Sequence, residues 1–471
     1  MTYDDRYLRL KTRRQIFRDC GVGAGKIALA SMLAGGAKAA VRQPHFPPRI
    51  DHVIFLSMAG APSQFELFDY KPALEKWHQQ PTPDSFLKGK RFAFMDSFTK
   101  EVPKILGPTR KFQQYGKSGM WFSELFPNIG SIADDLTLVR GISTENFNHG
   151  PAKLFTNTGS VRVGRPSIGA WVTYGIGTES DDLPGFVVLQ SGPRGPRSGA
   201  ALWSSGFLPT SYQGVPFRSA GDPILNLSTP KGIDAHEQRA TLDLIGDINR
   251  LELAESGDPE IQTRISQYEM AYRMQTSGPE LIDFSKESKA TLDMYGVEPG
   301  KSSYANNCLL ARRLVERGVR FVQLYHSDWD HHQDLGDPLT AVTKEVDKPT
   351  AALITDLKQR GLLDRTLVIW GGEFGRTPMG EVREKGKVGR NHHIDAYTLM
   401  MAGGGCPGGV IVGETDEFGF SPVGDHKTVH DVQATLLHKL GLDHEKLTYK
   451  FMGRNFRLTD VSGHVIKPLA G

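Results

Sequence analysis

The sequence predicts an α/β fold in which helices sandwich a largely parallel sheet, with long insertions on the functional face. Three observations carry this prediction. Short apolar runs such as residues 53–56 and 368–370 have the length of buried strands rather than of buried helices. Residues 304–317 have apolar side chains at helical spacing and lead directly into a further strand at 319–325. Polar residues follow these strands, and open α/β sheets bind ligands beyond the carboxyl ends of their strands.

The chain of 471 residues is expected to hold one domain, residues 41–471, behind an export signal at residues 1–40. The signal region has eight Lys and Arg against three Asp and Glu, a net charge of +5. Since the formal charge of the whole chain is +3, the domain carries −2. This removes the case for nucleic-acid binding by the folded body, because such binding needs a clustered positive face.

The first 40 residues have the regions of an export signal in order. Arg13 and Arg14 precede an apolar, small-residue stretch at 21–36, and residues 37–39, Ala-Lys-Ala, supply a small-x-small cleavage pattern. The pattern resembles a twin-arginine signal, which implies the export machinery for folded proteins and a periplasmic or extracellular location. The alternative is an amphipathic cytosolic helix. No later segment has the roughly 18 apolar residues of a membrane span, so none is expected after signal removal.

Two charged side chains follow the strand at 368–370. Gly371 closes the strand, and Glu373 and Arg376 come next, at the place where a sheet of this kind presents side chains to a ligand. The alternative is that these two residues pair with each other in a tight turn. Further buried strands are expected at 136–139, 186–189 and 396–402.

His149 follows the strand at 136–139 and precedes a predicted helix. Pro151 suits the first helical position and Gly159 suits a C-terminal stop, so His149 is expected just ahead of the helix N-terminus. Backbone N–H groups at such a terminus favour an anion. Helices are also expected at 166–174, 351–358 and 429–441, and the glycine- and proline-rich stretch 191–228 is expected to form a long loop region on the functional face.

Carboxylates and imidazoles recur at the predicted strand ends and in their loops. Asp330 and Glu373 follow neighbouring strands, and six histidines lie at such places: residues 149, 326, 331, 332, 392 and 393. Each histidine alone is more often an ordinary buried or surface residue than a ligand. Together with the carboxylates they predict a site for a divalent cation, either zinc or, where oxygen ligands dominate, manganese.

Five motifs carry a resemblance to a known family. With them the chain resembles the alkaline phosphatase and sulfatase superfamily, and within it a bacterial branch of exported, sulfatase-like proteins known as domain of unknown function 1501. The resemblance covers nearly the whole mature chain and implies an alkaline phosphatase-like fold. The motifs are FLSMAGAPS at 55–63, WDHH at 329–332, GGEFGRTP at 371–378, GRNH at 389–392 and GRNFRLTD at 453–460.

The chain departs from the superfamily where chemistry would be carried over. Sulfatases have their nucleophile in a Cys/Ser-x-Pro-x-Arg motif, and here the same spacing reads His149-x-Pro151-x-Lys153. The ordinary sulfatase mechanism is not expected, because formylglycine cannot be made from histidine. The superfamily's later Asp-His pair appears as Glu373-Phe374, which keeps one carboxylate and loses one imidazole.

The resemblance and the residues together suggest an exported, metal-dependent hydrolase of phosphate or sulfate esters, acting on an anionic ester or a sulfated glycan. His149 would act as general base or as a nucleophile. Lys153 and Arg376 would neutralise the charge of the oxyanion. The alternative is a protein that keeps the fold and an anion- or glycan-binding pocket without catalysis. The expected metal ligands are Asp330, His332, Glu373 and His392.

Overall fold

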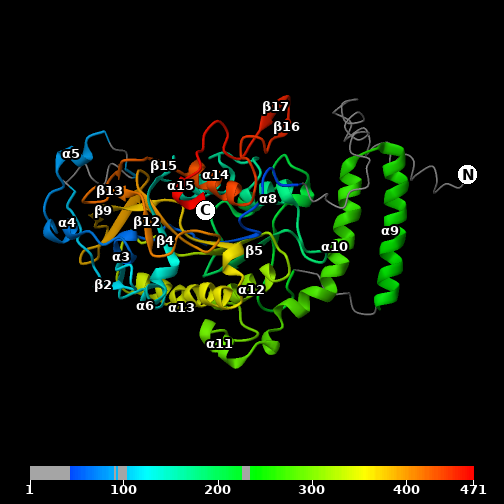
Figure 1. Cartoon of the computed structure of the whole chain (residues 1–471), viewed down its shortest axis with the longest axis horizontal. Coiled ribbons are helices and arrows are strands. Elements are labelled where there is room, and N and C mark those ends of the chain that lie inside the picture. Colours follow the sequence, from blue (N-terminus) through cyan, green and yellow to red (C-terminus); the bar gives the residue numbers. More distant parts are fainter. Residues whose placement is uncertain (1–42, 90–91, 94–102, 225–233, 471) are drawn as a thin grey trace, which may run out of the picture. The chain divides into compact units, whose positions relative to one another are not determined.

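The computed structural model describes residues 43–89, 92–93, 103–224 and 234–470 (Figure 1). The predicted export signal at residues 1–40 lies outside these residues. The described chain forms two compact units, one containing residues 234–272 and the other containing residues 43–224 and 273–470.

The smaller unit consists of helix α9, Ala235–Ser256, and the first part of helix α10, Pro259–Ile282. A capping box starts α9: the Asp234 side chain accepts from the Glu237 N–H, and the Glu237 carboxylate accepts from the Asp234 N–H. Arg239 of α9 lies 2.8 Å from the Glu269 carboxylate of α10, so an ion pair joins the two helices.

The larger unit contains a nine-stranded sheet with the order β12-β4-β11-β8-β1-β7-β5-β6, and β15 also pairs with β4. All neighbouring strands are parallel except β11, which is antiparallel to both β4 and β8. The prediction of an α/β fold with a largely parallel sheet is therefore confirmed. The strands are β1 (His52–Met58), β4 (Leu136–Ser143), β5 (Phe186–Ser191), β6 (Val215–Pro216), β7 (Phe321–His326), β8 (Thr366–Gly371), β11 (Tyr397–Ala402), β12 (Val410–Val412) and β15 (Lys427–Thr428).

Helices cover both faces of this sheet, so its central strands are buried along their whole length (Figure 1). One face packs on α8 (Ile168–Ile176) and α14 (Val429–Lys439), and the other on α12 (Tyr304–Val315) and α13 (Asp337–Gln359). Along β1, Val53 and Phe55 belong to the same core cluster as Trp171 of α8 and Leu436 of α14. Ile54 lies between them and points to the opposite face of the sheet, where it is also buried.

The remaining elements are short. Small helices are α3 (Gln64–Leu67), α4 (Pro72–Lys76), α5 (Asp84–Leu87), α6 (Pro127–Ser131), α7 (His149–Thr158), α11 (Lys289–Tyr295) and α15 (Lys467–Ala470). Two-stranded antiparallel sheets are formed by β2 (Phe112–Tyr115) with β3 (Met120–Ser123), β9 (Gly375–Glu381) with β10 (Gly389–His393), β13 (Glu414–Thr415) with β14 (Pro422–Val423), and β16 (Tyr449–Phe451) with β17 (Arg454–Phe456).

Two helices begin earlier than the sequence predicted. Helix α7 begins at His149 instead of after it, because the Asn148 side chain caps the helix by accepting from the Gly150 N–H. Gly159 ends this helix in a left-handed conformation, as expected. The helix expected at 351–358 is only the last part of α13, which starts at Asp337 and contains Pro349.

The register of the sheet brings three strand ends to one edge. Met58 of β1 pairs with His326 of β7, and Ser57 pairs with Gly371 of β8. The loop after β1 then passes very close to the loop after β7: a Cβ added to Gly60 would lie 2.7 Å from the backbone nitrogen of Asp330. Gly60 also has a φ of +116°, so both the space and the backbone require glycine here.

Candidate metal centre

The predicted site residues come from four different parts of the larger unit. Asp330 and His332 follow β7, Glu373 follows β8, and His149 and Lys153 lie on α7. Arg376 and His392 lie on the β9–β10 hairpin, where they are paired in register beside a bulge. Six of the seven are buried, and the Asp330 side chain is 27% exposed.

Three imidazoles meet at the Asp330 carboxylate. The Nε2 atoms of His149, His332 and His392 lie 3.0, 3.0 and 3.1 Å from its oxygens. The Nε2 atoms of His332 and His392 are only 2.8 Å from each other. The ligand atoms of these four residues all lie within 4.8 Å of one another, so the group could hold a metal ion.

Each of these imidazoles has its other ring nitrogen fixed by an acceptor. Nδ1 of His149 lies 2.7 Å from Glu373, Nδ1 of His332 lies 2.6 Å from Glu381, and Nδ1 of His392 donates to the Phe147 carbonyl at 2.6 Å. These acceptors favour a proton on Nδ1 and therefore a lone pair on Nε2. The outer acceptors thus aim three lone pairs at one place.

The resulting arrangement calls for a positive charge at its centre. Two neutral imidazoles with protonated Nδ1 atoms would face each other with lone pairs across 2.8 Å. The Nε2 atom of His149 is buried and has no well-directed hydrogen bond, although Asp330 is near it. Nitrogen lone pairs and one carboxylate that converge in this way fit a divalent cation, and the nitrogen-rich set suits zinc.

Electrostatics keep Asp330 ionised and His392 neutral. Burial would raise the pKa of the Asp330 carboxyl, but the surrounding histidines and Arg376 outweigh it and hold the pKa far below its ordinary value. Burial, together with nearby Arg376 and His149, lowers the pKa of His392 to about 3 in spite of Asp330. For His149, burial lowers the pKa, but Asp330 and Glu373 outweigh it and raise the value overall. The donor atoms of Asp330 and His392 are therefore in the protonation states that metal binding needs.

Glu373 lies behind His149 instead of at the centre of the cluster. Its Oε1 atom is 2.7 Å from Nδ1 of His149 and 2.9 Å from Nζ of Lys153, and the Gly60 N–H donates to it at 3.2 Å. Burial would raise the pKa of this carboxyl, yet Lys153 and His149 lower it to about 2. His149 thus occupies the place among the converging donors that the sequence assigned to Glu373. The sequence places Glu373 at the correct edge, but Lys153, from a distant helix, sets the direction of its side chain.

Arg376 holds the loops around Asp330. Its guanidinium lies 2.7 Å from Asp330 and donates to the carbonyls of Gly60, Ala61 and Arg390. Arg376 and Glu373 therefore take different partners, in contrast to the tight-turn alternative. The arginine side chain is 1% exposed, and its predicted contact with an oxyanion stays a prediction.

Three further residues support the centre, and the sequence did not single out two of them, Glu381 and Phe147. Glu381 holds His332, and the carbonyl of Phe147 holds His392. Glu66 forms a fully buried ion pair at 2.7 Å with Arg390, two residues before His392. A backbone carbonyl such as that of Phe147 leaves no signal in the sequence.

Two of the other three histidines of the predicted set have their partners elsewhere. His393 has Nε2 2.7 Å from the Phe420 carbonyl, and His326 packs against Tyr304. Burial lowers the pKa of both His326 and His331 to about 4, so they are neutral near pH 7. Position at a strand end did not separate these three from the three that converge.

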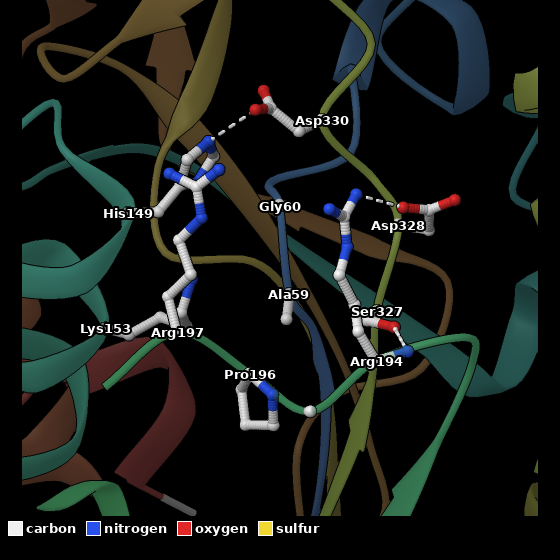
Figure 2. A pocket seen from close by; sticks show the side chains of 11 residues that line it. Ala59, Gly60, His149, Lys153, Arg194, Pro196, Arg197, Ser327, Asp328 and Asp330 are labelled. Atoms are coloured by element: carbon white, nitrogen blue, oxygen red, sulfur yellow. Dashed lines mark hydrogen bonds and ion pairs between the residues drawn. The ribbon is translucent and has the colours of Figure 1, made fainter. Parts of the chain in front are cut away.

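A pocket opens beside the cluster, and His149 and Asp330 form part of its wall (Figure 2). Three cationic side chains line it as well: Lys153, Arg194 and Arg197. The full lining consists of Ala59, Gly60, His149, Lys153, Arg194, Gly195, Pro196, Arg197, Ser327, Asp328 and Asp330. The arginines come from the stretch 191–228, for which the sequence predicted a loop region but no particular residue.

The family described as "Protein of unknown function (DUF1501)" matches residues 50–470. The chain belongs to this family. No curated protein matches it. Within the part of the chain that the structure describes, no helix is both long and apolar enough to cross a membrane.

Similar solved structures include enzymes of the alkaline phosphatase and sulfatase superfamily. A phosphonate monoester hydrolase from Silicibacter pomeroyi is 12% identical, with 90% of this chain and 77% of that chain covered and a TM-score of 0.35. The PsFucS1 sulfatase from Pseudoalteromonas sp. is 14% identical, with 90% and 73% covered and a TM-score of 0.35. Alkaline phosphatase from the Antarctic bacterium TAB5 is 9% identical, with 80% and 97% covered and a TM-score of 0.29. TM-scores this low carry neither substrate nor mechanism over to this chain.

Proposed function

We propose that the protein is an exported, divalent-metal-dependent hydrolase of phosphate or sulfate esters. The observation that carries the proposal is the convergence of three imidazole Nε2 atoms and the Asp330 carboxylate at the wall of a pocket with cationic side chains. A metal centre and a positively charged pocket are together what an anionic ester needs for binding and polarisation.

The metal would be held by His149, His332, His392 and Asp330. Zinc suits this nitrogen-rich set, and manganese is the alternative. When bound, the ion supplies Lewis acidity toward an ester oxygen or a water molecule. This assignment gives His149 a metal-binding role in place of the general base or nucleophile that its sequence position suggested, because both of its ring nitrogens are engaged.

The chain's own residues hold the donors and receive the ligand. Glu373 and Glu381 orient His149 and His332, and Arg376 positions Asp330. Lys153 keeps Glu373 ionised and forms part of the pocket wall. An anionic ester group, from a phosphate ester or a sulfated glycan, would enter on this side.

Metal analysis together with turnover of an aryl phosphate and an aryl sulfate tests the proposal. We expect stoichiometric zinc or manganese in the purified protein, and turnover that a chelator abolishes and the metal restores. Asp330→Asn should lose both metal and turnover, because it removes the charge at the centre of the cluster. Asp334→Asn, a matched change in the same loop whose carboxylate only caps the Gly336 N–H, should keep both.

A non-catalytic anion- or glycan-binding protein is the second candidate. It is favoured by the engagement of both nitrogens of His149, which leaves no free base at the position of the superfamily's nucleophile. Stoichiometric metal without turnover of either ester would support this candidate and contradict the hydrolase. Purified protein without bound metal would contradict the proposal of a metal centre.

The export part of the proposal rests on the twin-arginine pattern alone. The full chain with Arg13→Lys and Arg14→Lys should stay in the cytoplasm, whereas Arg18→Lys, outside the pair, should leave export intact. Cell fractionation measures both. Equal export of all three proteins would contradict a twin-arginine route.

A further inference from the structure

Of the three cations that line the pocket beside the metal cluster, one has no counter-ion among the residues that the structure describes. Lys153 is balanced by Glu373, with 2.9 Å between Nζ and Oε1. Arg194 is balanced by Asp328 across the mouth of the pocket (Figure 2). Asp330, the remaining acid of the lining, is in contact with the histidines and with Arg376.

Arg197 differs from the other two cations. Among the described residues, no carboxylate, carbonyl or aromatic ring partners its guanidinium. Its side chain extends from the loop in the direction of His149 (Figure 2). Since a guanidinium stays charged at any physiological pH, this leaves a fixed positive charge facing the space where a ligand would lie.

The loop that carries Arg197 is held on both sides. A Cβ added to Gly192, where φ is +89°, would lie 2.5 Å from Oγ of Ser327, so the loop start is packed tightly against the loop after β7. Beyond Arg197, Ser198 lies close to the first turn of α7. A Cβ added to Gly150 in that turn would lie 3.2 Å from Oγ of Ser198. The backbone that presents Arg197 to the pocket is therefore packed against neighbouring segments on both sides.

We propose that Arg197 is a specificity-determining residue of this pocket and that it selects ligands with two negative charges over singly charged ligands of the same shape. This inference rests on the proposed function in placing the anionic group in the pocket. It deepens that function by favouring phosphate monoesters, which carry a second negative charge, over sulfate esters, which carry one.

The effect of Arg197 on ligand preference is additional to that of a bound metal ion. A divalent cation attracts both kinds of ligand and already favours the doubly charged one. Arg197 adds a further charge that no side chain of the described pocket cancels, and its planar fork can donate to two oxygens of one ligand. The contribution of Arg197 is thus the change in preference when only this residue is altered.

Binding of two non-hydrolysable probes isolates this contribution. At mildly alkaline pH, phenylphosphonate carries two negative charges and benzenesulfonate carries one, with nearly the same shape. Titration calorimetry at low salt should show tighter binding of phenylphosphonate to the wild-type protein. Arg197→Gln should weaken phenylphosphonate binding about tenfold, the scale of a hydrogen bond to a charged group, and change benzenesulfonate binding much less.

Arg194→Gln is the matched control, because it lies on the same loop but its charge is already paired with Asp328. It should change the preference by less than Arg197→Gln. An unchanged preference in Arg197→Gln, an equal loss in Arg194→Gln, or no binding of either probe by the wild-type protein would each overturn the inference. Unchanged thermal unfolding of both variants excludes misfolding as the cause.

The same samples separate this inference from the proposed function. Metal content and ester turnover decide whether the protein is a metal-dependent hydrolase, whereas the ratio of the two probe affinities decides the role of Arg197. A protein that lacks turnover but discriminates the probes through Arg197 keeps the inference and loses the hydrolase. A protein that has turnover but does not discriminate the probes through Arg197 keeps the hydrolase and loses the inference about Arg197.

Discussion

The six histidines at the functional edge divide into two groups that the sequence could not tell apart. All six are buried: His149, His332 and His392 in one group, and His326, His331 and His393 in the other. In the first group an acceptor binds Nδ1 and Nε2 points at Asp330. In the second group, His393 directs Nε2 at a backbone carbonyl, and His326 is 0% exposed beside Tyr304.

The difference lies in which ring nitrogen has a partner outside the cluster: Nδ1 in the first group, but Nε2 in His393 and in His326, whose Nε2 lies 3.5 Å from Glu345. Burial and position at a strand end are common to both groups, so neither property marks a ligand. A carboxylate or carbonyl behind the ring fixes the tautomer and turns the ring toward a common centre. Changes to a converging histidine, to a residue behind its ring and to a histidine of the other group should therefore have different effects.

Removing a converging imidazole should have the largest effect. His392→Ala deletes one of the four donors, and we expect zinc affinity to fall by more than the roughly 10- to 100-fold that loss of an outer partner costs. His326→Gln, a change to a buried histidine that faces away, should retain full metal. Bound metal after dialysis against a graded chelator measures both. Equal loss in the two variants would mean that the grouping is wrong.

Changing the residue behind a ring should have an intermediate effect. Glu381→Gln removes the charge that holds Nδ1 of His332 and should lower zinc affinity roughly 10- to 100-fold. Glu384→Gln, three residues later and paired only with Lys387, should leave it unchanged. Competition with a chromogenic chelator gives the affinities. An unaltered affinity in Glu381→Gln would show that the outer partner is not needed to orient the ring.

The smallest effect concerns stability rather than metal. Burial lowers the pKa of His326 from 6.5 to about 4, in spite of nearby Asp328. A buried histidine whose pKa is lowered by folding makes its full contribution to stability at pH values above the pKa that it has in the unfolded chain. This contribution is lost as the pH falls, because only the unfolded chain takes up the proton. Between about pH 7 and about pH 5, the free energy of unfolding should fall by about 2 kcal/mol through this residue.

Denaturant unfolding at the two pH values tests the last prediction. His326→Gln has no titrating side chain at position 326, so its free energy of unfolding should depend less steeply on pH than that of the wild-type protein. Parallel pH dependences for the two proteins would contradict the assignment of His326 as a buried neutral histidine.

The sequence predicted the sheet better than the site, and the reason is physical. Apolar runs such as 53–56 and 368–370 fix which segments are buried strands, and parallel pairing then brings their ends to one edge. That is enough to place Asp330, His332 and Glu373 near one another. The antiparallel direction of β11 leaves no trace in its composition, because a central strand is buried on both faces whichever way it runs.

Side-chain direction could not be predicted in the same way. Glu373 was expected among the metal ligands, and it turns instead to Lys153, whose position depends on the packing of α7. Arg376 was expected to face the ligand, and it reaches Asp330 and backbone carbonyls. Arg197 was missed because its significance lies in the lack of a counter-ion among the described residues, which only the folded arrangement reveals.

Gly60 gives the centre an unexpected point of fragility. Its N–H donates to Glu373, its carbonyl accepts from Arg376, and the backbone of Asp330 fills the space where a side chain would be. One small residue without any chemistry of its own therefore ties the tails of three strands together. In a saturation screen for metal content, replacements of Gly60 should lose as much metal as replacements of the donors. A map of intolerant positions would therefore include Gly60 among the ligands, although it binds no metal.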